Sequence, residues 1–81
     1  MVPTYYDQVH QIRDNLRRLR HAKGLSQENL AYEADVNRSY MSRLEKGVSY
    51  PGLEIIGKLA AVLGVEPAEL LKLPPKKRRP Q

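Results

Sequence analysis

The polar side chains between residues 37 and 46 are the ones whose types and spacing suggest chemistry, and that chemistry is hydrogen bonding to another molecule. On a helical wheel the apolar residues of this segment share one side, whereas the serines and the lysine point to the opposite side between two flanking arginines. Arginine can donate two hydrogen bonds to O6 and N7 of guanine, and serine can bond base edges or phosphate. The polar residues are Asn37, Arg38, Ser39, Ser42, Arg43 and Lys46. The pattern is typical of a helix that lies in a DNA groove, although for an isolated helix an ordinary solvated face is the simpler interpretation.

Two short helices joined by a tight turn would hold this polar face in place. Ser26 can cap the first helix, where the flanking leucines are spaced as a hydrophobic staple. Asp35 follows as the turn residue, and Asn37 can cap the second helix. Gly47 can then end it in a left-handed conformation. Residues 24–47 therefore predict one structural unit whose second helix covers residues 37–46.

Three further helices are predicted on either side of this unit. Apolar residues at spacings of three and four indicate an amphipathic helix over residues 7–23 and another over residues 53–63. Pro67 suits the first position of a short helix that ends at residue 71. The apolar stripes comprise Val9, Ile12, Leu16 and Leu19 in the first of these helices and Leu53, Ile56, Leu59, Ala60 and Leu63 in the second. We therefore expect an all-α fold, a compact five-helix bundle.

Composition limits the class of protein further. The 81 residues suffice for one small domain, which we place at residues 7–72. The absence of cysteine excludes disulfides and thiolate metal sites, and the longest apolar run is too short to cross a bilayer. His10 and His21 would lie about 16 Å apart on one helix, so they cannot hold one metal ion together. Because the sequence shows no activated nucleophile, metal cluster or glycine-rich phosphate loop, we expect neither an enzyme nor a cofactor.

The net charge of +5 is concentrated at the C-terminal end of the sequence. Of the 14 Lys and Arg residues five lie at or after Lys72, so residues 1–71 carry as many basic as acidic residues and are neutral. Residues 73–81 predict a disordered, flexible basic tail. Such a tail could contact phosphates, resemble a nuclear-import signal or simply remain solvated, and the sequence leaves these three interpretations open.

Residues 11–71 resemble the XRE family, the Cro/CI-type or lambda-repressor-like helix-turn-helix domains. The resemblance rests on residues 25–31 (LSQENLA), residues 36–47 with LEKG at their end, Pro51, residues 58–60 (KLA), residues 63–65 (LGV) and residues 70–71 (LL), in the family's order and spacing. It implies a five-helix domain that binds double-stranded DNA through its third helix and regulates transcription.

The resemblance also assigns roles by position. The residues that would face the bases are Asn37, Arg38, Ser39, Ser42 and Arg43. Those that would contact the DNA backbone are Ser26, Gln27, Tyr40, Lys46 and Tyr50. Gln27 would in addition brace the recognition helix, and burial in the core is the alternative to a phosphate contact for Tyr40.

One ion pair and two departures follow from the same resemblance. In the family an Arg near the end of the first helix pairs with a Glu at the end of the recognition helix, which implies a pair between Arg20 and Glu45; the alternative is two surface charges that never meet. Asp35 stands where the family usually has Gly in a left-handed turn, and Gly52 replaces the usual Ser or Thr cap. Because Asp tolerates the left-handed region better than most residues, we expect the turn to form.

One recognition helix reads too few base pairs to find a site in a genome, so we expect a homodimer on an inverted repeat with half-sites about 34 Å apart. Leu70 and Leu71 are the candidates for its interface. A phage or plasmid repressor, an autoregulator and a restriction-modification controller protein all fit, and the alternative is an antitoxin or a module whose main partner is another protein. We expect a cytoplasmic bacterial protein with no membrane contact, no small-molecule effector and no second, ligand-sensing domain.

Overall fold

The computed structural model describes residues 5–72, with side chains described from residue 10 onward. Within these residues the chain forms five helices and no strand, which confirms the predicted all-α fold. The helices are α1 (Tyr5–Ala22), α2 (Gln27–Glu33), α3 (Arg38–Lys46), α4 (Leu53–Leu63) and α5 (Ala68–Leu71). The side chain of Val9, predicted to join the first apolar stripe, and the predicted tail at residues 73–81 lie outside the described residues.

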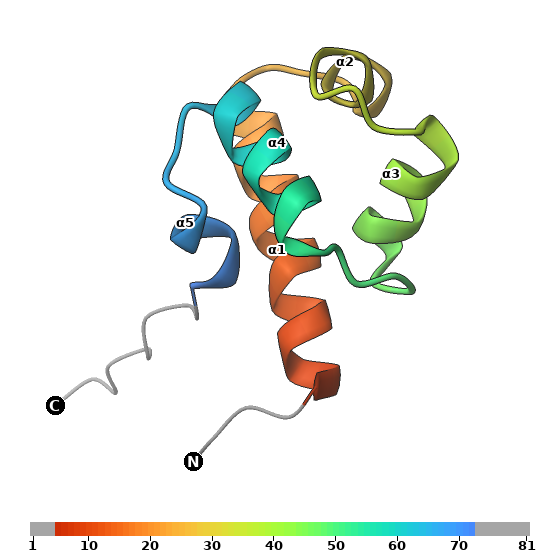
Figure 1. The fold of residues 1–81 in the computed structure, drawn as a ribbon, viewed down its shortest axis with the longest axis vertical. Helices are drawn as coiled ribbons and strands as arrows, with labels where there is room; N and C mark the ends of the chain where they lie inside the picture. The colour runs from red at the N-terminus through yellow and green to blue at the C-terminus, as the bar shows by residue number, and fades with distance from the viewer. Residues whose placement is uncertain (1–4, 73–81) are drawn as a thin grey trace, which may run out of the picture.

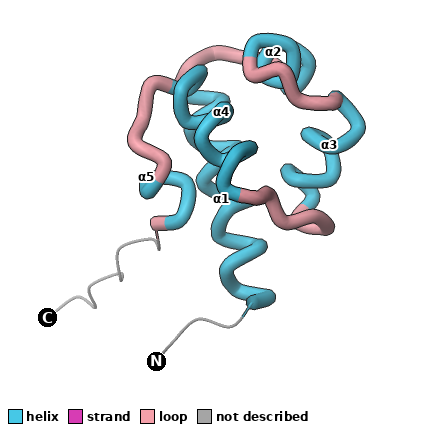
Figure 2. The backbone as a smooth tube through the Cα atoms, in the orientation of Figure 1, coloured by secondary structure: helices cyan, strands magenta, loops and turns pink. Residues whose placement is uncertain are grey.

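The long helix α1 runs through the middle of the arrangement (Figure 1). It packs against α3 on one side and α5 on another, and α2 packs against both α3 and α4. A short turn joins α2 to α3, and a longer loop leads from α3 to α4 (Figure 2). α3 is therefore supported from behind by α1 and α2, while its other side forms an edge of the molecule.

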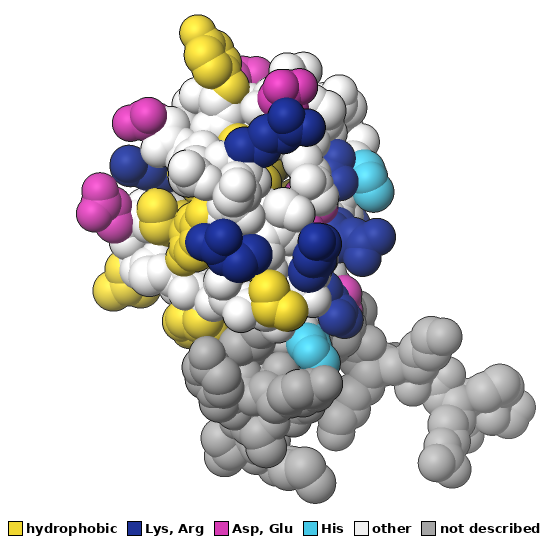
Figure 3. Space-filling view, turned by 90° about the vertical axis from the view of Figure 1, so that its right-hand side faces the viewer, with side chains coloured by type: hydrophobic (Ala, Val, Ile, Leu, Met, Phe, Trp, Pro, Cys, Tyr) yellow, Lys and Arg dark blue, Asp and Glu magenta, His cyan; other side chains and the backbone are white. Residues whose placement is uncertain are grey.

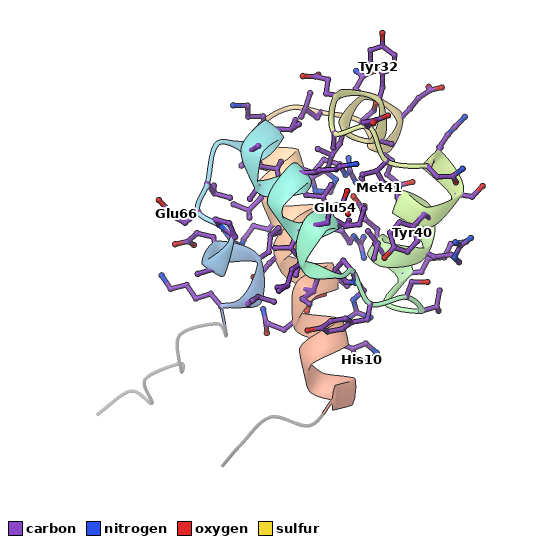
Figure 4. All side chains as sticks on the ribbon, in the orientation of Figure 1. His10, Tyr32, Tyr40, Met41, Glu54 and Glu66 are labelled. Carbon is purple, nitrogen blue, oxygen red and sulfur yellow. The ribbon has the colours of Figure 1, made fainter. Side chains whose placement is uncertain are left out.

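One apolar core draws on all five helices. Its fully buried large side chains include Leu16, Leu30, Met41, Leu44, Leu59 and Leu70. Each such side chain contributes about 1.5–3 kcal/mol when it is removed from water. Figure 4 shows Met41 turned inward from α3, whereas Tyr32 of α2 points away from the body into solvent. Because helices as short as α3 and α5 are not stable alone, this packing is what keeps them in place.

Local capping sets where α2 and α3 begin and end. Oγ of Ser26 accepts a hydrogen bond from the backbone N–H of Asn29 at 3.0 Å, and Oδ1 of Asn37 accepts one from the N–H of Tyr40 at 3.2 Å. Gly47 ends α3 with φ = 78°, a conformation that costs other residues about 1–2 kcal/mol. Asp35 adopts φ = 55° in the turn, so the predicted left-handed turn forms without a glycine.

The structure corrects several boundaries and one core residue. α1 covers Tyr5–Ala22 rather than residues 7–23, and Pro67 precedes α5 as its N-cap instead of opening it. Leu53, predicted to belong to the buried stripe of α4, is 83% exposed. It shares the face of buried Ala60, but it is the first residue of the helix, where the core does not cover that face. The remaining members of that stripe are buried as predicted.

Candidate nucleic-acid interface

The outer side of α3 presents exposed hydrogen-bond donors that make few contacts within the protein. Arg38, Ser39, Arg43 and Lys46 are exposed, and Ser42 is half-buried between them. Met41 and Leu44 anchor the opposite side of the helix in the core. Figure 3 looks onto this side of the molecule and shows Lys and Arg side chains over its middle, with most acidic side chains nearer its upper and left-hand margins. The face therefore offers hydrogen-bond donors and positive charge together.

Arg43 is held in a defined direction on this face. Its Nε donates to Oγ of Ser49 at 3.3 Å, and its guanidinium carbon lies 5.6 Å from the centroid of the Tyr40 ring, within cation–π range. Its two terminal amino groups make no hydrogen bond to any residue that the structure describes. These are donors that a guanine O6 and N7 can accept from.

The Tyr40 side chain is half-buried and packs against the core. Its hydroxyl donates to the backbone carbonyl of Tyr50 at 3.2 Å, which fastens α3 to the loop before α4. The structure shows the packing of Tyr40 against the core, and a phosphate contact of its hydroxyl stays a prediction. Tyr50 itself is 41% exposed in that loop.

Arg38 at the start of α3 pairs with Glu28 of α2. The distance from Nη1 to Oε2 is 3.4 Å and both side chains are largely exposed. A pair of this kind contributes at most about 1 kcal/mol, so Arg38 can exchange Glu28 for another acceptor at little cost. Asn37 differs, because its Oδ1 accepts the hydrogen bond that caps α3, while its amide nitrogen makes no hydrogen bond with the residues that the structure describes.

A buried ion pair ties α3 to α1. Arg20 donates through Nε to Oε2 of Glu45 at 2.6 Å and through Nη2 to Oε1 at 2.9 Å, a two-point contact between a planar guanidinium and a carboxylate. Arg20 also donates to the backbone carbonyl of Leu25 at 2.8 Å. The two-point geometry fixes the rotation of α3 about its axis as well as its distance from α1.

Gln27, at the start of α2, completes this cluster. Its Nε2 donates to Oε1 of Glu45 at 3.1 Å, so the side chain braces α3 from the α2 side. Ser26 is exposed beside it, with its hydroxyl accepting the cap hydrogen bond. Both residues expected at the DNA backbone thus also serve the fold.

Asn15 is a buried polar residue that the sequence reasoning missed. Its Nδ2 donates to the backbone carbonyls of Leu70 at 2.9 Å and Lys72 at 2.8 Å, and its Oδ1 accepts from Nε2 of Gln11 at 3.1 Å. This amide ties the end of α5 to α1. The one available signal was a lone asparagine beside the apolar stripe of α1, and such a residue does not reveal its partner.

The two leucines expected at a dimer interface, Leu70 and Leu71, differ in their exposure to solvent. Leu70 is 1% exposed and belongs to the core of the single chain, because the Asn15 contacts pull the end of α5 against α1. It therefore cannot present its side chain to a second copy in this conformation. Leu71 is 44% exposed and keeps an apolar surface.

Other kinds of site find little support in the described part of the chain. No three His, Cys, Asp or Glu side chains within it lie close enough to hold a metal ion. None of its helices combines the length and the hydropathy needed to cross a bilayer. What the residues around α3 can do is donate hydrogen bonds and attract negative charge.

Comparison with known proteins places this arrangement among related domains. A model of the helix-turn-helix domain family matches residues 11–73. The control protein C.BamHI of Bacillus amyloliquefaciens is 42% identical over 57 residues, which cover 69% of this chain and 70% of that protein. The crystal structure of the restriction-modification controller protein C.AhdI from Aeromonas hydrophila has a TM-score of 0.74 and 45% identity, over 76% of this chain and 94% of the other.

A third relative comes from Neisseria. The crystal structure of the hypothetical transcription factor NHTF has a TM-score of 0.80 and 39% identity, over 93% of this chain and 85% of the other. In sequence, the hypothetical transcription factor of Neisseria meningitidis is 44% identical over 64 residues, which span 59% of its own length. The sequence comparison and the structure comparison thus both include a hypothetical transcription factor from Neisseria.

Proposed function

Because the chain belongs to the helix-turn-helix domain family and is a DNA-binding transcriptional regulator of the XRE type, we propose that it acts as a homodimer on an inverted-repeat operator. Each protomer would place α3 in the major groove of one half-site, with the two half-sites about 34 Å apart. The observation that carries this proposal is the exposed polar side of α3, whose buried side is fastened to α1 by the Arg20–Glu45 pair.

Base recognition would fall to the first and middle turns of α3. Arg43 has the strongest claim, because Ser49 and Tyr40 orient its guanidinium while leaving both terminal amino groups for a guanine. Arg38 would exchange its weak pair with Glu28 for a base or a phosphate. The remaining residues proposed to face the bases, with shorter side chains, are Asn37, Ser39 and Ser42.

Phosphate contacts would position the helix without reading sequence. Lys46 is exposed at the end of α3, and Tyr50 lies in the loop that follows it. Ser26 and Gln27 stand at the N-terminus of α2, where backbone N–H groups favour an anion. The hydroxyl of Tyr40 would hold the Tyr50 loop in place and assist indirectly.

Regulation by protein concentration is the simplest mode for such a dimer. Of the two leucines considered for the interface only Leu71 has the exposure required, so we propose that the surface around α5 pairs with its copy through Leu71. Similarity to C.BamHI and to the restriction-modification controller C.AhdI favours a controller that regulates its own operon over other members of the family.

Selection of bound sequences from a random duplex pool at about 150 mM salt tests this function, since that ionic strength suppresses nonspecific phosphate binding. We expect an enriched inverted repeat, and its position upstream of genes would separate a controller from a phage repressor. If folded protein enriches no sequence, the operator is ruled out and a protein partner becomes the better explanation.

Arg43→Ala provides the residue-level test. The variant should lose about 1–3 kcal/mol of binding free energy for the selected site while nonspecific binding changes little, because a base contact has been removed. Lys58→Ala is the matched control, since it removes a positive charge from α4, where Lys58 approaches Glu54 at 3.7 Å. An equal loss of affinity for every DNA sequence would remove Arg43 from base recognition.

A further inference from the structure

A second basic surface lies beside α3, on α1, and the function proposed above makes no use of it. This surface consists of the exposed parts of Arg13 and Arg17. Arg13 is partly covered, with 29% of its side chain exposed, and Arg17 is exposed. In Figure 3 Lys and Arg side chains continue from the middle of the face toward its right-hand margin.

Contacts on either side of Arg17 fix where it lies. Arg20 reaches Glu45 of α3, and a methyl group on Gly47 at the end of α3 would lie 3.2 Å from Cδ of Arg13. Residues at spacings of three and four share one face of a helix, so Arg17 lies on the same side of α1 as Arg13 and Arg20. Arg17 is therefore beside the C-terminal half of α3, with its side chain in solvent.

The charges around this position leave Arg17 available. It makes no hydrogen bond or ion pair with the residues that the structure describes. The charge of Arg13 is partly neutralised, because its Nε lies 3.0 Å from Oδ1 of Asp14. The carboxylate of Glu45 accepts hydrogen bonds from Arg20 and Gln27. Because exposed Lys46 is nearby on α3, the local balance is positive.

The opposite side of α3 has a different character. Tyr50 and Leu53 are exposed there, in the loop that the Tyr40 hydroxyl contacts and at the start of α4, and Glu54 adds an acidic side chain that is 83% exposed. A helix inserted in the major groove, which is about 12 Å wide, has one sugar-phosphate backbone on each side. The two sides of α3 therefore meet the two backbones with unequal charge.

We propose that Arg17, with Arg13 beside it, binds the phosphate backbone that borders α3 on its α1 side. This contact rests on the function proposed above, and it adds residues of α1 to the phosphate contacts proposed for α2, α3 and the loop after α3. A charge contact of this kind strengthens binding to every duplex and carries no sequence information. The surface of the domain that faces DNA then extends onto α1.

The salt dependence of binding tests the proposal, with Arg17→Ala and Arg18→Ala as a matched pair. Both variants remove one arginine from α1, but Arg18 turns toward Asn15, with Nη2 3.4 Å from Oδ1, and away from α3. Loss of one phosphate contact lowers the slope of log affinity against log salt by about 0.9. The proposed homodimer carries two copies of Arg17, so Arg17→Ala should lower the slope by about 1.8. Between about 50 and 200 mM salt the variant should therefore lose about 12-fold less affinity than the wild type, and Arg18→Ala should follow the wild type.

Two further measurements separate a contact from a structural effect. Arg17→Lys keeps the charge and should restore the wild-type slope, and thermal melting should show all three variants folded. Phosphate-ethylation interference on the selected duplex should lose one position in each half-site in Arg17→Ala and none in Arg18→Ala.

Each outcome decides between the proposals. Equal slopes for Arg17→Ala and Arg18→Ala overturn the α1 contact while leaving the function of α3 intact. A wild type that binds duplexes with no preferred sequence, yet loses slope in Arg17→Ala, overturns the operator and supports the α1 contact. Failure of the wild type to bind any duplex overturns both.

Discussion

Two buried polar side chains fasten α1 to its neighbours, and they do so with different chemistry. Arg20 is a cation that holds the carboxylate of Glu45 on α3 through two hydrogen bonds, at 2.6 and 2.9 Å. Asn15 is a neutral amide that holds two backbone carbonyls at the end of α5, at 2.9 and 2.8 Å. Each also receives help from a glutamine: Gln27 donates to Glu45 and Gln11 donates to Asn15.

The charged contact, Arg20 to Glu45, orients α3, the helix proposed to enter the DNA. The neutral contact, made by Asn15, satisfies the carbonyl groups at the C-terminal end of α5. Bidentate pairing restricts direction, so it suits α3, where a small rotation would redirect Arg43. α5 has four residues, too few to be stable on its own, and the asparagine satisfies carbonyls that would otherwise lack donors. On one side of α1 a charged pair orients α3, and on another side a neutral amide holds the end of α5.

Glu45→Ala should remove the Arg20–Glu45 pair and have the largest effect on stability of the substitutions considered. Removing the carboxylate leaves the Arg20 guanidinium buried without its partner, which costs about 3–5 kcal/mol of the free energy of unfolding. Urea denaturation followed by circular dichroism measures the loss. Glu54→Ala is the control, because Glu54 is exposed and its removal should change stability by about 0.5 kcal/mol or less. Similar losses in the two variants would mean that the pair does not hold α3 in solution.

Asn15→Ala should break the neutral tie at a smaller cost. The carbonyls of Leu70 and Lys72 lose their donor, and an unsatisfied buried polar group costs about 1–3 kcal/mol. The loss should be local, so hydrogen exchange should accelerate at the amides of α5 and remain slow in α3. Equal acceleration in both helices would contradict the division of tasks between the two ties.

The sequence was informative where the chemistry of both partners is visible in the residue types. An arginine and a glutamate at family positions predicted the pair between α1 and α3, and cap residues such as Asn37 and Gly47 predicted the ends of α3. Asn15 escaped because its partners are backbone carbonyls, which every residue carries. The sequence also did not predict which of the two adjacent leucines is buried. In a helix as short as α5, either Leu70 or Leu71 could have faced the core.

The surface around α3 was predictable only in part, for a related reason. The polar side of α3 follows from the helical period of its own residues, so its exposure could be expected. Arg17 lies on another helix, and its place beside α3 depends on how α1 and α3 pack. Charge counted along the chain gave a neutral domain, whereas packing separates a basic side from an acidic and apolar one.

The two glutamines provide the finest test of the comparison. Gln27→Ala and Gln11→Ala are the same substitution at half-buried helical positions, and each removes one hydrogen bond of 3.1 Å. The bond from Gln27 ends on a carboxylate and should be worth about 1.5 kcal/mol, whereas that from Gln11 ends on a neutral amide and should be worth about 0.5 kcal/mol. Gln11 lies inside α1 and Gln27 is the first residue of α2, so the gain in helix propensity from alanine falls on Gln11→Ala. This gain lowers the cost of Gln11→Ala and therefore adds to the expected difference of about 1 kcal/mol. Urea denaturation of the two variants side by side measures that difference. If Gln11→Ala proves as costly as Gln27→Ala, the charge of Glu45 adds nothing to the tie, and geometry alone distinguishes the two sides of α1.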